Sequence, residues 1–194
     1  ALFYERLFPN IFNDIVYMYS KSMAILQWLD QNVEKVVIFI CYASMAGIVF
    51  VEVIRRFVFS QQAAWSTTIP IYLFLWITWV GASYNVRLRT HLKFDELRIR
   101  LPYILQFSLQ VFDAVLWFVF GIIVIIYSTE QVNLAKDNFM IVQGTDNVLQ
   151  WWFYLATPVA WTLLLFRVLQ NLWEDIQLFR AGKPLLIQST IDGG

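Results

Sequence analysis

Four long apolar stretches divide the chain, at about residues 34–59, 67–90, 101–129 and 147–173. A helix rises about 1.5 Å per residue, so each stretch is long enough to cross about 30 Å of hydrocarbon. The apolar positions are nearly continuous and do not alternate with the period of two that a membrane strand would show. The pattern therefore predicts an all-α integral membrane protein with four transmembrane helices.

The segment before the first stretch, residues 1–32, carries a different pattern. Between Pro9 and Asp30, apolar residues recur at intervals of three and four, and polar residues fall mostly between them. A single apolar stripe of this kind is typical of an amphipathic helix that lies in the membrane interface. A soluble helix packed on a partner would show the same stripe, and we take the interfacial helix as the prediction.

The end of the chain forms a third expected region. Gly182 and Pro184 favour the end of a helix, and no periodic pattern follows them. We therefore expect an N-terminal segment with the interfacial helix at 1–32, a four-helix transmembrane domain at 33–180 and a flexible C-terminal tail at 181–194.

Composition supports a membrane protein and narrows the chemistry. Apolar residues make up 59% and charged residues 14% of the chain, whereas soluble domains have about 45–50% and about 25%. The net charge is zero, which gives no indication of a nucleic-acid partner. Cys41 is the only cysteine and His91 the only histidine, which excludes an intrachain disulfide and bis-histidine haem ligation within this chain. Because no phosphate-binding or dinucleotide-binding motif is present either, we expect neither enzyme activity nor a cofactor.

The basic residues predict how the four helices are oriented. With four spans, both termini lie on the same side of the membrane, and the segments of that side hold 11 of the 14 Lys and Arg residues. The opposite side holds Arg55, Arg56 and Lys136. Because short connections rich in basic residues stay in the cytoplasm, we expect both termini to be cytoplasmic.

Ionisable residues inside the expected spans need partners, because burying a charge at the bilayer centre costs at least about 2.5 kcal/mol. Glu52 precedes Arg55 and Arg56 by three and four residues. An ion pair within the helix is one interpretation, and separate contact of each side chain with the interface is another. A contact of Glu52 with another helix or subunit is equally consistent with this position.

Asp113 and Arg167 lie at similar expected depths in the third and fourth spans. An ion pair between them would lower the cost of burying both charges. We favour this structural pair over a proton or sodium relay, because ion-coupled pumps usually place several acidic groups in the membrane interior. His91 lies in the short connection after the second span, where we favour a solvated or loop-capping role over pH sensing.

The order of several short motifs resembles that of a known family. The first stretch ends with an acid-to-arginine pattern at Glu52 and Arg56, and Trp65 precedes the second. The second stretch contains Leu75-Trp76-Ile77-Thr78-Trp79-Val80-Gly81 and leads into a basic–His–x–x–x–Asp turn at Arg89, His91 and Asp95. Over roughly residues 33–172 the chain resembles the small membrane subunit, called DctQ or Q, of tripartite ATP-independent periplasmic (TRAP) transporters. It differs from the family pattern at Ser66, Thr67 and Thr68, where acidic residues are common, and at Arg89 and Thr90, where glycine is common.

The resemblance implies a three-part secondary transporter of the bacterial inner membrane. A periplasmic substrate-binding protein (P-type) delivers an organic acid anion to a large multi-span subunit (M-type), which carries it across with sodium by an elevator-like movement. The small subunit is then a scaffold that contacts the large subunit and membrane lipid and carries neither substrate nor sodium. Two other classes stay as alternatives: a membrane-anchor subunit of a respiratory or other redox enzyme, and an autonomous four-helix channel or sensor.

Two sets of residues are candidates for contacts. The residues of the family motifs and the charged residues of the spans are candidates for packing or subunit contacts: Glu52, Arg55, Arg56, Trp65, Trp76, Gly81, Arg89, His91, Asp95, Asp113 and Arg167. The charged residues of the expected loop between the third and fourth spans are candidates for docking of the binding protein: Glu130, Lys136, Asp137 and Asp146.

Overall fold

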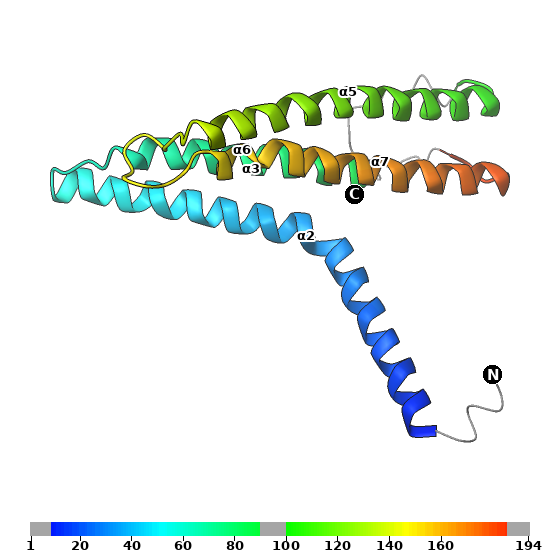
Figure 1. Ribbon diagram of the computed structural model, residues 1–194. Coiled ribbons are helices and arrows are strands. Elements are labelled where there is room, and N and C mark those ends of the chain that lie inside the picture. The colour runs from blue at the N-terminus through cyan, green and yellow to red at the C-terminus, as the bar shows by residue number, and fades with distance from the viewer. Residues whose placement is uncertain (1–8, 90–99, 186–194) are drawn as a thin grey trace, which may run out of the picture.

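The computed structural model describes residues 9–89 and 100–185, and this part of the chain is built from helices (Figure 1). The helices are α2 (Pro9–Val58), α3 (Trp65–Arg87), α5 (Tyr103–Asp137), α6 (Trp151–Tyr154) and α7 (Ala156–Arg180). Four segments are long and apolar enough to cross a membrane: Met23–Val58, Trp65–Arg87, Tyr103–Asp137 and Trp151–Arg180. The predicted all-α membrane fold with four transmembrane helices is therefore confirmed.

The helix α2 contains both the expected interfacial helix and the first expected span. It is continuous across residues 32 and 33, where the pattern predicts a boundary between two segments. Figure 1 shows that α2 is bent in its light-blue part and that its N-terminal portion diverges from the other helices. The position of this portion relative to the membrane, and the side on which the termini lie, stay predictions.

The helix α5 is longer than the third apolar stretch predicts. It continues to Asp137 rather than ending near residue 129. Val132 and Ala135 are buried in this extension, so packing against the rest of the chain stabilises the additional turns. Glu130, Lys136 and Asp137 consequently lie on a helix, and the expectation that they lie in a loop is wrong. The connection itself is shorter and comprises residues 138–150, which we call the 138–150 loop.

The fourth membrane segment is interrupted at Leu155, between α6 and α7. Pro158 is the third residue of α7 and has no N–H, so it cannot donate to the carbonyl of Tyr154 as a helical residue would. Leu155 keeps helical backbone angles, φ −58° and ψ −21°. The chain therefore passes from α6 to α7 without leaving a helical conformation.

The helices pack in the order α2, α3, α7 and α5. The helix α3 contacts α2 and α7, and α7 also contacts α5 (Figure 1). The core lies among α3, α5 and α7, and its buried residues are Val86, Ala114, Trp161, Leu164 and Val168. Gly121 allows α5 to approach α7 closely, because a Cβ at this position would lie 2.7 Å from Cδ2 of Leu165.

The 138–150 loop packs against the beginning of α3. Inside the loop, the Val142 N–H donates to the Val148 carbonyl at 2.8 Å. Gly144 has φ +82°, and a Cβ there would lie 2.5 Å from the backbone nitrogen of Trp65. Both the left-handed backbone and the close approach therefore require glycine at this position.

Candidate functional site

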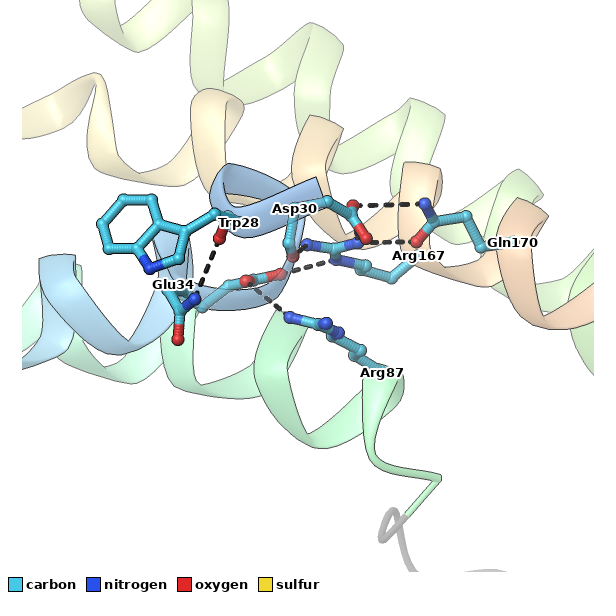
Figure 2. Close-up of polar contacts among 7 residues, drawn as sticks. Trp28, Asp30, Glu34, Arg87, Arg167 and Gln170 are labelled. Carbon is cyan, nitrogen blue, oxygen red and sulfur yellow. Dashed lines mark hydrogen bonds and ion pairs between the residues drawn. The ribbon is translucent and has the colours of Figure 1, made fainter. Parts of the chain in front are cut away.

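A buried arginine connects the fourth membrane segment to the first. Arg167 on α7 is only 1% exposed. Its Nε donates to Oε1 of Glu34 at 2.5 Å and its Nη1 donates to Oδ1 of Asp30 at 2.5 Å, and both acceptors lie on α2 (Figure 2). The third guanidinium nitrogen, Nη2, donates to the Asp30 carbonyl at 2.6 Å. All three nitrogens of Arg167 are therefore bound to α2.

Two further side chains complete this group, which we call the Arg167 cluster: Asp30, Glu34, Arg87, Arg167 and Gln170. Arg87 is the last residue of α3, and its Nη1 lies 3.4 Å from Oε2 of Glu34, which is fully buried. Gln170 accepts a hydrogen bond from Arg167 at 2.6 Å and donates one to Asp30 at 3.3 Å. Two guanidinium groups thus balance two carboxylates. Removing one partner from such a buried group leaves an uncompensated charge, so the cluster fixes α2, α3 and α7 relative to one another.

Two side chains donate to backbone carbonyls of α2 near the Arg167 cluster. The side chain of Asn32 donates to the Trp28 carbonyl at 3.0 Å, and Arg167 donates to the Asp30 carbonyl. Side-chain donors compete with the backbone hydrogen bonds of a helix, and such competition is a known cause of bending. No glycine or proline lies between Pro9 and Gly47. These two contacts are therefore consistent with a bend in this part of α2.

A second charged group holds the end of α3 against α7. Arg89 has φ +56°, a left-handed conformation that glycine adopts most easily. Its side chain donates to Asp175 at 2.6 Å, to Glu174 at 3.1 Å and to the Asn171 carbonyl at 3.1 Å. These three contacts stabilise the strained backbone. They explain how arginine occupies a position where the family pattern commonly has glycine.

Glu52 contacts the segment before α3 rather than a neighbouring arginine. Its Oε1 accepts the Ala63 N–H at 2.9 Å. Among the described residues, no ion pair joins Glu52 to Arg55 or Arg56, so the interpretation as a pair within the helix is not supported. The N–H groups before and in the first turn of a helix have no partner inside it, and a carboxylate stabilises them. Arg55 is half-buried and Arg56 is exposed.

Asp113 does not pair with Arg167, so this prediction is also wrong. Asp113 is half-buried and lines a hollow with Leu116, Trp117 and Phe120. Its neighbour Ala114 is buried in the core, and successive helical residues are rotated by about 100°. Asp113 and Ala114 therefore point in different directions, and Arg167 meanwhile contacts α2. The expected depths of the two residues were similar, but depth does not fix the direction in which a side chain points.

The remaining motif residues lie mostly on α3. Trp65 is its first residue, and Trp76 and Gly81 are half-buried. A Cβ at Gly81 would meet no atom within 4 Å, so packing inside this chain does not require glycine there. His91 and Asp95 lie outside the described residues. The roles of these residues in subunit contacts stay predictions.

The four docking candidates are all exposed. Glu130, Lys136 and Asp137 lie on the last turns of α5, and Asp146 lies in the 138–150 loop. The Nζ of Lys136 is 5.9 Å from the ring centroid of Trp151, within the range of a cation–π contact. Docking of a binding protein to these residues stays a prediction.

The sequence analysis did not identify Asp30 and Glu34, which are the partners of Arg167 in the structure. They lie four residues apart at the beginning of the first apolar stretch, so they share one face of a helix. Two acidic residues on one face at a membrane boundary are a signal for a basic partner. Within the described part of the chain, no group of three or more His, Cys, Asp and Glu residues is placed to hold a metal ion. The hydrogen bonds and ion pairs of the Arg167 cluster join α2, α3 and α7.

The fold and the cluster define the class: a multi-pass helical membrane protein whose buried polar contacts join its helices. Residues 45–178 match the family model described as "Tripartite ATP-independent periplasmic transporters, DctQ component". The chain therefore belongs to the DctQ family, which confirms the resemblance seen in the sequence. It is a small permease subunit of a TRAP transporter in the bacterial inner membrane, functions with other components of that transporter and is not an enzyme.

Three relatives have names that agree with this family. The chain is 24% identical over 166 residues to the C4-dicarboxylate TRAP transporter small permease protein DctQ of Vibrio cholerae, which covers 75% of this chain and 72% of the relative. It is 26% identical over 145 residues to the sialic acid TRAP transporter permease protein SiaT of Haemophilus influenzae, covering 75% of this chain and 23% of the relative. It is 23% identical over 178 residues to the isethionate TRAP transporter permease protein DctMQ of Oleidesulfovibrio alaskensis, covering 84% of this chain and 26% of the relative. The chain thus spans about a quarter of the length of the last two relatives.

Proposed function

We propose that this chain is the static scaffold of a sodium-coupled transporter for an organic acid anion, and that a larger permease subunit carries the substrate and the ion. The match of residues 45–178 to the DctQ family carries this proposal. The names of the three relatives specify a C4-dicarboxylate, sialic acid and isethionate, all of which are organic anions. An organic anion is therefore the substrate class that we expect for the complete transporter.

Two observations support a large membrane partner. The relatives SiaT and DctMQ are permease proteins in which this chain matches only 23% and 26% of the length. In addition, α2 exposes a long apolar face that includes Phe39, Phe50 and Phe57. A second membrane subunit that covers part of this face would be consistent with the expected M-type partner.

The scaffold role agrees with the way in which the helices are joined. The Arg167 cluster ties α2, α3 and α7 together, and Arg89 fastens the end of α3 to α7. A support for an elevator-like movement has to keep its own helices fixed while the partner moves. Buried charged contacts suit that requirement, because separating them is costly.

The binding protein is expected to dock at the end of the protein that carries the exposed charges of α5 and the 138–150 loop. With cytoplasmic termini, this end faces the periplasm. Charges at the rim of an interface mainly affect the association rate and its salt dependence.

The partner proposal is tested by isolating this chain from its native membrane in mild detergent and identifying the proteins that co-purify. A larger multi-span permease in near-stoichiometric yield is expected. Recovery of the chain alone, with sodium-dependent uptake of organic anions unchanged when the chain is deleted, would contradict the scaffold role.

The docking proposal is tested by reversing the charges of Glu130, Lys136 and Asp137 together and measuring uptake as a function of binding-protein concentration. We expect the concentration required for half-maximal uptake to rise, because the reversed charges slow association of the binding protein. The matched control reverses Arg180 and Lys183, which lie on the opposite side in the expected topology. Equal behaviour of the two variants would contradict docking at this end.

A further inference from the structure

A polar pocket lies beside the Arg167 cluster, between α2, α3 and α7. It has a volume of about 290 Å³ and is lined by Asp30, Arg87, Gln170, Asn171, Trp173 and Glu174. This volume is close to the lower end of the range for small-molecule sites, about 300 Å³. The pocket also offers groups of both charges, Arg87 on one side and Asp30 and Glu174 on the other.

The pocket lies at the expected level of lipid headgroups. Its residues come from the points where three helices reach the predicted membrane boundary, near residues 34, 90 and 173. Trp173 lines the pocket and is 60% exposed, and Trp28 on the adjacent turn of α2 is 57% exposed. Exposed tryptophan is enriched where hydrocarbon gives way to headgroups. A ligand of this pocket is therefore expected to come from the membrane.

Arg87 supplies the positive group of the pocket. Its contact with Glu34 uses one guanidinium nitrogen, Nη1, at the long distance of 3.4 Å, and its side chain is 22% exposed. A guanidinium carries five N–H donors in a planar fork that matches the oxygens of a phosphate. Arg87 therefore has the capacity to bind a phosphodiester while it stays beside Glu34.

Two carboxylates supply the negative groups. Asp30 uses Oδ1 for Arg167 and Gln170, and Glu174 uses Oε2 for Arg89, so the second oxygen of each can accept further hydrogen bonds. Their side chains are 42% and 64% exposed. An anionic headgroup without a cation would be repelled by these two groups, whereas a headgroup that also carries an ammonium would be attracted.

We propose that this pocket binds the headgroup of phosphatidylethanolamine, with the phosphate at Arg87 and the ammonium at Asp30 and Glu174. A quaternary choline ammonium has no N–H to donate to the carboxylates, and phosphatidylglycerol has no cation. The pocket is therefore selective for an aminophospholipid. This inference concerns the chain itself and does not depend on the proposed transport function.

The test measures lipid binding to the full chain, purified in mild detergent and washed free of lipid. The chain is incubated with phosphatidylethanolamine, phosphatidylcholine or phosphatidylglycerol of identical acyl chains, and bound lipid is counted by native mass spectrometry. We expect phosphatidylethanolamine to bind about tenfold more tightly than the other two, since hydrogen bonds to charged groups are of that size. Equal binding of the three lipids would overturn the proposal.

Three variants locate the binding to the pocket. Arg87→Gln is expected to weaken phosphatidylethanolamine binding about tenfold, whereas Arg180→Gln, at the end of α7 and outside the pocket lining, should bind as the unmodified chain does. Glu174→Gln changes an exposed side chain and should weaken binding of phosphatidylethanolamine more than that of phosphatidylcholine, because only the ethanolamine ammonium donates hydrogen bonds to this carboxylate. Thermal unfolding of each variant verifies that it is folded. Equal binding by Arg87→Gln and Arg180→Gln would contradict the proposal.

A soluble competitor distinguishes a lipid from a free metabolite. Glycerophosphoethanolamine has the same polar groups without acyl chains. At equal concentration it is expected to leave the bound lipid in place, because the acyl chains add binding to the apolar surface beside the pocket. Complete displacement by this compound would assign the pocket to a soluble ligand and overturn the assignment to a membrane lipid.

Discussion

The helices α7 and α2 meet at the Arg167 cluster but are held in different ways. In the most apolar stretch of the α7 segment, 44% of the residues are buried inside the chain, whereas none is buried in the corresponding stretch of α2. The stretch of α2 is nevertheless the more apolar of the two. In water the more apolar helix would be buried, but lipid solvates apolar side chains about as well as a protein core does. Burial within this chain therefore does not follow hydrophobicity alone.

This difference separates the two helices in function as well. The helix α7 contacts α3 and α5 and contributes Trp161, Leu164 and Val168 to the core. The helix α2 contacts α3 and is joined to α7 by the polar contacts of Asp30 and Glu34. Its opposite face is left for lipid or for another subunit. Changes on α7 should therefore alter the stability of the chain itself, whereas changes on the exposed face of α2 should alter assembly.

The largest effect is expected at the contact between the two helices. Arg167→Met leaves Glu34 buried without its closest cation, and we expect the free energy of unfolding to fall by about 3–5 kcal/mol. Chemical unfolding of the purified chain in detergent measures this loss. The double variant Arg167→Met, Glu34→Leu removes both buried charges and is expected to recover most of the stability.

The control for this prediction is Arg180→Met, which removes an exposed arginine from the last turn of the same helix. Its effect should be within about 0.5 kcal/mol. If Arg167→Met were as stable as the control, the Arg167 cluster would not be what joins α2 to α7.

A smaller effect is expected from truncating one leucine on each helix. Leu164 on α7 is 1% exposed, and Leu29 on α2 is 44% exposed. Leu164→Ala should lower the free energy of unfolding by about 2–5 kcal/mol because it leaves a cavity in the core. Leu29→Ala should change it by about 0.5 kcal/mol or less. Similar losses in the two variants, measured by thermal and chemical unfolding, would show that α2 is packed in the same way as α7.

The smallest effect is expected from adding one methyl group at two helical glycines. A Cβ at Gly121 would lie 2.7 Å from Leu165 of α7, whereas a Cβ at Gly47 of α2 would meet no atom within 4 Å. Gly121→Ala should therefore destabilise the chain by about 1–3 kcal/mol through overpacking. Gly47→Ala should stabilise it by up to about 1 kcal/mol, because alanine is the better helix former. Destabilisation of the purified chain by Gly47→Ala would contradict the conclusion that this face of α2 is not packed against the rest of the chain.

The fold could be predicted from the sequence because a membrane leaves few alternatives. Backbone polar groups cannot stay unpaired in hydrocarbon, so a continuous apolar run of the right length has to form a helix. The four stretches and the family motifs around Glu52, Trp65 and Gly81 could therefore be identified without a structure. Helix ends were less certain, since α5 continues to Asp137 through turns that pack on the rest of the chain.

The charged contacts could be predicted only in part. The sequence showed that Arg167 needs an acidic partner, because an isolated charge in the membrane is costly. It did not show which acid, since spacing along the chain gives the depth of a residue but not the direction in which its side chain points. The tertiary structure decided in favour of Asp30 and Glu34 over Asp113, because packing of α7 between α3 and α5 turns Arg167 toward α2. The sequence by itself thus determined that there are four membrane helices and where the costly charges lie along them. Only the packing of those helices determined which charges meet.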